Sequence, residues 1–207
     1  MNTNFSEIFY EAERNAMSFM ESEYSFRSVD RRVVDEWVFG TATYAEAPTL
    51  NKPRDLELFV TLSVAPLRLE LDLYIGVGEN KKTNYSIYEL YRLERVGDFP
   101  RRQHNLYEAM HDVQQLQAEF ENLTQVLRDC GSRFFAGDKL LWDDLSKQRL
   151  SLTKAQDDIR ASRNAEKAFT AKQWDQVIIL LEPRESRLSK VDTAKLTYAR
   201  KHREMGT

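Results

Sequence analysis

Apolar residues at the start of the chain recur every three or four positions. They are Phe5, Ile8, Phe9, Ala12, Ala16, Phe19 and Met20. Side chains at this spacing share one face of an α-helix. The pattern predicts a helix over residues 5–22, and Asn4, with Glu7 three positions later, is typical of a helix start.

From residue 34 the apolar period changes to two, which indicates β-strands with one buried face. The clearest alternation is Leu67–Ile75, in which every odd residue is apolar. Trp37–Tyr44, Leu56–Val64 and Asn84–Leu93 are the other predicted strands, and Pro or Gly residues separate the four. Short connections favour an antiparallel meander. We expect a four-stranded sheet with the odd residues of Leu67–Ile75 in the core.

After Pro100 the helical period returns. The apolar positions are Leu106, Met110, Val113, Leu116, Phe120, Leu123, Leu127 and Cys130. They predict one long helix that covers the sheet and ends at Gly131. Asp138 is the expected N-cap of a further helix, with breaks near Lys172 and at Pro183. The predicted fold class is α+β.

The C-terminal segment contains a weak internal repeat with an offset of 34 residues, in which Asn164-Ala165 corresponds to Tyr198-Ala199. That period is the one of tetratricopeptide (TPR) repeats. The segment from Ala165 to Pro183 resembles the back of a TPR unit, with the key positions Trp174, Val177, Ile178 and Leu181. Lys172 stands where glycine is usual, and the second unit stops at its turn. We therefore expect an α+β core over residues 1–150 and one TPR-like helical hairpin over residues 151–207, docked on that core.

Three motifs extend a resemblance over nearly the whole chain. They are Tyr85-Ser86-Ile87-Tyr88-Glu89-Leu90, Gly137-Asp138-Lys139-Leu140-Leu141-Trp142 and Lys195-Leu196-Thr197-Tyr198-Ala199-Arg200-Lys201. In this order the chain resembles a set of uncharacterised bacterial α+β proteins, which are similar in style to the immunity partners of bacterial toxins. The resemblance implies a helix, strand meander, long helix and final hairpin, and an immunity-like role. It supplies no catalytic motif.

Composition and charge narrow the function classes. The 207 residues carry a net charge of −3, with 42% apolar and 30% charged side chains, as in a globular protein. No apolar run is long enough to span a bilayer, and the first residues lack a basic and an apolar region, so we expect a cytoplasmic protein without a membrane partner. An acidic pI near 5.8 argues against nucleic acid as a partner. Residues 1–150 carry −7 and residues 151–207 carry +4.

Motifs for catalysis are missing from the sequence. There is no P-loop, G-x-S-x-G or H-E-x-x-H pattern. We interpret His104 and His111 as solvated residues of the long helix, and Cys130 as a buried, inert thiol. The adjacent pairs Asp143-Asp144 and Asp157-Asp158 diverge on a helix and are interpreted as solvated. No catalytic residue, metal ligand or cofactor is predicted.

The strand Leu67–Ile75 carries the strongest candidate for binding. Its polar face holds Glu70, Asp72 and Tyr74, and we expect Glu57, with Thr61 and Ser63, on the same face of the neighbouring strand. Either this is a plain hydrophilic sheet face, or it binds a partner. The hypothesis is a non-catalytic interaction protein, immunity-like or adaptor-like, that binds a protein with a basic surface through Glu57, Glu70, Asp72 and Tyr74.

Two alternatives stay open. The first is a hydrolase or nucleotide-processing enzyme whose site is assembled from distant residues, with Glu89, Asp138 and His104 as candidates. The second is nucleic-acid binding through the pairs Arg31-Arg32 and Arg101-Arg102, which are weak support. The sequence does not fix the partner or the oligomeric state, self-association included.

Overall fold

The computed structural model describes residues 4–34, 39–47, 58–65, 70–78, 83–94 and 98–205. The chain forms two compact units, Met1–Ser146 and Lys147–Thr207, with the division inside one helix, α6 (Lys139–Thr170). Each unit has its own cluster of buried apolar side chains. The docking of the second unit on the first therefore stays a prediction.

The N-terminal unit contains a five-stranded antiparallel sheet in simple chain order. Its strands are β1 (Phe26–Val34), β2 (Phe39–Glu46), β3 (Leu58–Ala65), β4 (Glu70–Val77) and β5 (Thr83–Ser86). The α+β class and the antiparallel meander are confirmed, but the predicted four strands are five. The additional strand, β1, is a mostly exposed edge strand.

Arg31 explains why the sequence pattern did not predict β1 as a strand with one apolar face. It is opposite Ala42 of β2, on the face that packs against α1 (Phe5–Tyr24), where an apolar residue is the usual choice. The guanidinium Nε lies 3.2 Å from Oε2 of Glu13, a fully buried residue of α1 that also accepts a hydrogen bond from the Tyr44 hydroxyl. An ion pair between a buried carboxylate and a partly exposed guanidinium thus replaces the apolar contact.

The predicted strand Asn84–Leu93 is wrong beyond Ser86. The helix α2 (Ile87–Glu94) begins directly after β5. The Glu89 carboxylate accepts a hydrogen bond from Ser86 N at 3.0 Å, and Ser86 Oγ accepts one from Tyr88 N at 3.2 Å. This S-x-x-E arrangement is a capping box, which starts a helix in a segment whose side chains also fit a strand.

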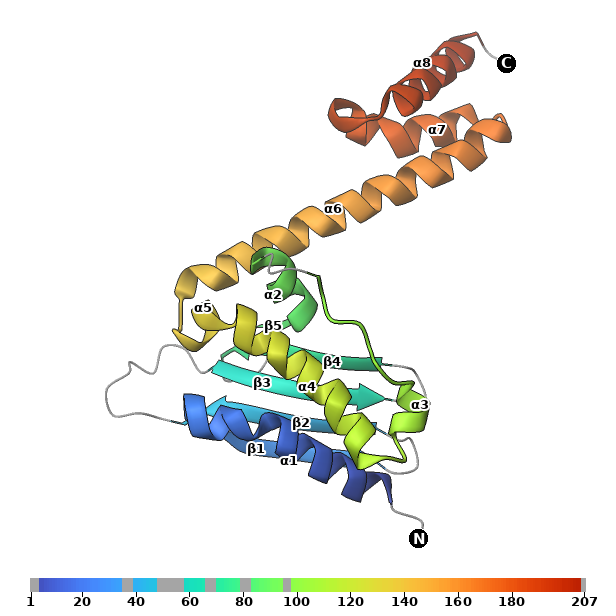
Figure 1. The fold of residues 1–207 in the computed structure, drawn as a ribbon. Helices are drawn as coiled ribbons and strands as arrows, with labels where there is room; N and C mark the ends of the chain where they lie inside the picture. Colours follow the sequence, from blue (N-terminus) through green and yellow to red (C-terminus); the bar gives the residue numbers. More distant parts are fainter. Residues whose placement is uncertain are drawn as a thin grey trace. The chain divides into compact units, whose positions relative to one another are not determined.

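Two helices cover one face of the sheet. Figure 1 shows α1 and α4 (Val113–Cys130) lying side by side across the strands. Leu71, Leu73 and Ile75 of β4 are buried in this layer, as predicted for the odd positions, whereas Leu67 and Leu69 lie outside the described residues. α1 packs so closely that a Cβ at Gly40 would lie 2.6 Å from the Phe9 ring.

The predicted single helix over residues 106–130 is two helices. α3 (Leu106–Ala109) ends before Asp112, which caps α4 by accepting hydrogen bonds from Gln114 N and Gln115 N. Gly131 has φ −84° instead of a left-handed conformation. Glycine is needed at this position because the backbone packs closely here. A Cβ on residue 131 would lie 2.2 Å from Leu127 O at the turn into α5 (Ser132–Phe135).

The expected helix start at Asp138 is confirmed. Asp138 Oδ1 accepts a hydrogen bond from Leu140 N at 2.9 Å, at the beginning of α6. The other carboxylate oxygen, Oδ2, pairs with Nε of Arg133 at 2.7 Å, and Arg133 also binds Asp144 and Glu94. Charge-assisted bonds thereby fix the turn between α5 and α6.

The C-terminal unit consists of the end of α6, α7 (Trp174–Leu181), the 3₁₀ helix η3 (Glu182–Arg187) and α8 (Lys190–Glu204). The turn before α7 contains Lys172 with φ 56°, a left-handed conformation at the position where the resemblance expects glycine. The core of the unit consists of Ala165, Ala168, Val177, Ile178, Leu181, Leu196 and Ala199. Both predicted helix breaks are present.

Among the residues that the structure describes, no helix combines the length and the hydropathy needed to cross a bilayer.

Candidate functional site

The face of the sheet that α1 and α4 leave uncovered carries the residues singled out from the sequence. Glu70 is exposed, and Asp72 and Tyr74 are half-buried. In the register of β3 and β4, Ser63 is directly opposite Asp72 and Thr61 is opposite Tyr74. Their expected common face is confirmed. The fourth predicted binding residue, Glu57, lies outside the described residues.

Asp72 is held by neighbours inside the fold. Its carboxylate accepts hydrogen bonds from Ser86 Oγ at 2.8 and 2.9 Å and from Leu73 N at 2.8 Å. Burial raises the pKa of Asp72 and the Glu89 carboxylate adds to this, although the two donors act in the opposite direction. Asp72 therefore connects β4 to β5 and is a less accessible charge than the sequence suggests.

Tyr74 marks the centre of a negatively charged region. Burial raises the pKa of its phenol, and the carboxylates of Asp72, Glu70 and Glu89 raise it further. Three carboxylates thus act on one hydroxyl. Within the described residues, neither Glu70 nor Asp72 forms an ion pair. We call Glu70, Asp72, Tyr74, Ser86 and Glu89 the acidic corner.

Ser86 and Glu89 belong to this site but were not assigned to it from the sequence. The capping box brings them there, because it ends β5 beside Asp72 and turns the chain into α2. The signal was present in the S-x-x-E spacing, which reads Ser86-Ile87-Tyr88-Glu89. The described residues contain no group of three or more side chains suited to hold a metal ion.

His104 has a partner that the sequence did not reveal. It precedes α3, so its interpretation as a solvated helical residue is wrong. Its Nδ1 lies 3.1 Å from Oε1 of Glu119, which is only 1% exposed and also accepts from the backbone N of Gln103 and His104. The second oxygen of Glu119, Oε2, is buried and has no hydrogen-bond partner among the residues that the structure describes.

The three residues of the enzyme hypothesis have separate partners. His104 pairs with Glu119, Glu89 caps α2 at Ser86, and Asp138 pairs with Arg133, whose hydrogen bond lowers the pKa of Asp138. These contacts, all within the described residues, bring no two of the three together.

The remaining histidine and cysteine match their interpretations in part. Cys130 is a free, buried thiol, which confirms its predicted burial, and burial raises its pKa. His111 is exposed as expected, but it lies in the turn between α3 and α4.

Several charged residues that were interpreted as solvated form ion pairs. Asp144 binds Arg133, and Asp158 binds Arg184 and Arg187, whereas Asp143 and Asp157 are exposed. Of the four arginines considered for nucleic-acid binding, Arg31 pairs with Glu13, and Arg32, Arg101 and Arg102 are exposed.

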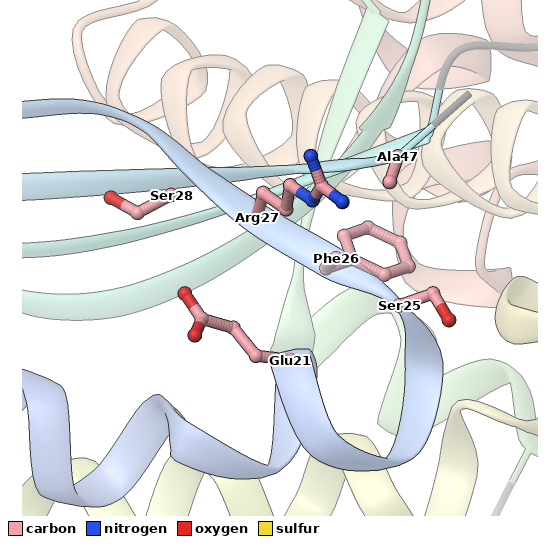
Figure 2. A pocket seen from close by; sticks show the side chains of 6 residues that line it. All are labelled: Glu21, Ser25, Phe26, Arg27, Ser28 and Ala47. Carbon is pink, nitrogen blue, oxygen red and sulfur yellow. The ribbon is translucent and has the colours of Figure 1, made fainter.

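A hollow of about 420 Å³ lies where α1 ends and β1 begins. Figure 2 shows its lining side chains, which are Glu21, Ser25, Phe26, Arg27, Ser28 and Ala47. One acidic, one basic and two hydroxyl side chains make this lining largely polar, whereas small-molecule sites are mostly apolar. No member of the acidic corner lines it.

Comparisons of the chain with protein-family models, with curated proteins and with solved structures gave no match.

Proposed function

We propose that this chain is a non-catalytic protein-binding protein whose acidic corner receives a basic surface of its partner. The observation that carries the proposal is the placement of the exposed Glu70 with Asp72 and Tyr74 on one face of β4, where the carboxylates of Asp72, Glu70 and Glu89 add to burial in raising the pKa of the Tyr74 phenol. Glu70 is exposed and has no ion-pair partner among the described residues, so its charge is available to an incoming cation.

Lysine and arginine side chains fit such a corner chemically. Carboxylates accept charge-assisted hydrogen bonds from both cations, and arginine binds them in bidentate geometry. Thr61 and Ser63 on the adjacent strand add short polar side chains beside the carboxylates. Complementary charge chiefly raises the rate of encounter and the specificity of the complex.

The biological setting of this proposal comes from the resemblance described above. An immunity partner or adaptor needs a surface that recognises one protein and no reactive group of its own. We propose that role in the cytoplasm, with the C-terminal helices as a TPR-like hairpin. Its supporting residues are the buried Ala165, Val177, Ile178 and Leu181.

Charge reversal of Glu70 tests the proposal. Glu70→Lys is expected to weaken capture of the native partner by the full chain at least about tenfold, with the larger effect at low salt, because an exposed charge acts mainly on encounter. Glu11→Lys is the matched control, since Glu11 is an exposed carboxylate of α1. Binding is measured with the captured partner after purification.

Asp72 is unsuited to the same reversal, because a lysine there would remove the acceptor of the Ser86 hydrogen bonds. Asp72→Asn is the suitable second variant. Unchanged capture by both Glu70→Lys and Asp72→Asn would place the interface elsewhere.

The His104–Glu119 pair favours a second candidate function, a hydrolase. A buried carboxylate behind an imidazole orients the ring and makes its other nitrogen a general base. The experiment is turnover of phosphate esters and nucleotides by the purified chain. The hydrolase proposal requires activity that His104→Ala removes, and the binding proposal requires none.

A further inference from the structure

α8 has apolar side chains on two sides. Leu196 and Ala199 are buried in the core of the C-terminal unit. Val191, Tyr198 and Met205 are instead 63%, 46% and 53% exposed. Val191 and Tyr198 belong to α8, and Met205 is its C-cap residue in a helical backbone conformation. The three are seven residues apart, so they form one line, which we call the α8 stripe.

Neighbouring rings hold the central residue of the stripe in place. The Tyr198 ring centroid lies 4.2 Å from that of His202, 5.4 Å from Phe169 and 5.5 Å from Trp174. Trp174 in turn stacks on His202 at 5.2 Å. An exposed aromatic side chain fixed by packing loses little entropy on binding, which is a property of interface anchors.

The stripe belongs to a positively charged unit. Lys147–Thr207 contains 14 Lys and Arg against 8 Asp and Glu. Most of the carboxylates are already neutralised, namely Asp158, Glu166, Glu182, Glu185 and Asp192, by Arg184, Arg187, Lys195 and Arg200. Within the described residues, Lys190 and Lys201 of α8 flank the stripe, are exposed and form no ion pair. The free charge beside the stripe is therefore mainly positive.

The spacing of the apolar residues and the surrounding charge indicate which kind of partner can bind the α8 stripe. An exposed apolar line along one helix can pack against the apolar face of an amphipathic helix, and the surrounding charge decides which one. A second copy would bring two units of net charge +6 together, which opposes self-association through this face. A single-stranded nucleic acid would stack on free ring faces, but Trp174 and His202 stack on each other and the ends of the stripe are aliphatic or thioether side chains.

We propose that the α8 stripe is a docking surface for an acidic amphipathic helix of a partner protein, with Tyr198 as its anchor and Lys201 beside it. This surface is separate from the acidic corner and takes a partner of the opposite charge.

The test selects binders from a displayed library of random peptides, with the full chain as the immobilised target. Enriched peptides are expected to carry apolar residues three and four positions apart together with Asp or Glu. The double variant Val191→Glu/Met205→Glu should weaken their binding at least about tenfold, because it removes apolar area and repels the acidic peptide.

Thr193→Glu/Thr197→Glu is the matched control. It adds the same charge to exposed positions of the same helix, off the stripe, and should retain binding within about threefold, because only the long-range repulsion remains. Tyr198 is left intact in both variants, so the ring cluster is kept, and circular dichroism and thermal unfolding verify the fold of each.

Four outcomes would overturn the proposal. One is the absence of any peptide enriched on the unmodified chain over Val191→Glu/Met205→Glu, and another is enrichment of basic peptides. The third is tighter binding of a thymidine 20-mer than of the selected peptides. The last is a dimer in sedimentation velocity that Val191→Glu/Met205→Glu dissociates, which would assign the stripe to a second copy.

Discussion

The two units of the chain differ in what holds them together. The core of the N-terminal unit is filled by large side chains, among them the fully buried Phe9, Phe120 and Phe134, whereas Ala165, Ala168 and Ala199 supply much of the core of the C-terminal unit. Small cores bury less apolar area and contribute less stability. In the second unit, ion pairs between arginines and carboxylates accompany that smaller core.

The units also differ in charge. Met1–Ser146 has 16 Lys and Arg against 25 Asp and Glu, a balance of −9, and Lys147–Thr207 has a balance of +6. The net charge of −3 for the whole chain is the sum of these two opposite charges. An argument from net charge about partners has to be made for each unit separately, since partners respond to the local potential.

The largest expected effect is on the core of the N-terminal unit. Leu71→Asp would place a carboxylate at a β4 position that is 5% exposed. We expect a loss of about 4 kcal/mol or more in the free energy of unfolding, because the charge would be buried without a partner. Urea denaturation measures it. Glu70→Gln, at the exposed neighbouring position, should change it by less than about 0.5 kcal/mol. Equal stability of Leu71→Asp and the unmodified chain would refute the register of β4.

A smaller effect is expected in the C-terminal unit from Asp158→Asn. Asp158 pairs with Arg184 and Arg187, and the Arg187 hydrogen bond lowers its pKa. Its contribution to stability is thus present above the unfolded-state pKa and is lost as pH falls through the folded-state pKa. Asp158→Asn should lower the thermal midpoint at pH 7 and flatten its decline in acid.

Asp157→Asn is the control for this substitution, because Asp157 is adjacent, exposed and outside these ion pairs. Thermal unfolding at low and high salt provides the comparison, since salt screens exposed pairs. If both substitutions shift the midpoint equally, the ion pairs of Asp158 contribute nothing.

The smallest effect, of opposite sign, is expected from Asp72→Asn in the N-terminal unit. Burial raises the pKa of Asp72, so its favourable contribution is complete below the unfolded-state pKa and is lost as pH rises through the folded-state pKa. The neutral amide should leave stability at pH 7 equal or higher by up to about 1 kcal/mol. It should also remove the pH dependence between the two pKa values.

Urea titrations at a series of pH values measure this change. Asp72→Ala is the informative counterpart, because it removes the acceptor of the Ser86 hydrogen bonds and should destabilise the unit. A pH profile for Asp72→Asn that coincides with that of the unmodified chain would contradict the burial argument.

The periodicity of apolar residues in the sequence predicted the elements that bury one face and expose the other. α1 and the odd residues of β4 were found in this way, because their apolar side chains reach the core at a regular spacing. β1 was missed since Arg31 faces inward and is compensated by Glu13, a residue distant in sequence. The break at Asp112 was missed because α3 and α4 both contribute to the same core, which keeps the apolar spacing continuous.

The candidate site, like the fold, was predicted only in part from the sequence. Glu70, Asp72 and Tyr74 share a strand, so the period of two identified their common face. Ser86 of β5 joins them because β5 pairs with β4. Glu119 of α4 contacts His104, which precedes α3. The local S-x-x-E spacing signals the helix start at Ser86, but the contacts of Ser86 with Asp72 and of Glu119 with His104 depend on tertiary packing, which no local pattern encodes.

The Ser86 hydroxyl ties two elements into one cooperative segment. The same oxygen donates to Asp72 across the sheet and accepts from Tyr88 N at the first turn of α2. Pairing of β4 with β5 and initiation of the helix therefore support each other, as hydrogen bonds in a connected network do. In hydrogen exchange the two would open together as a single foldon, and the acidic corner would be assembled or lost as a whole.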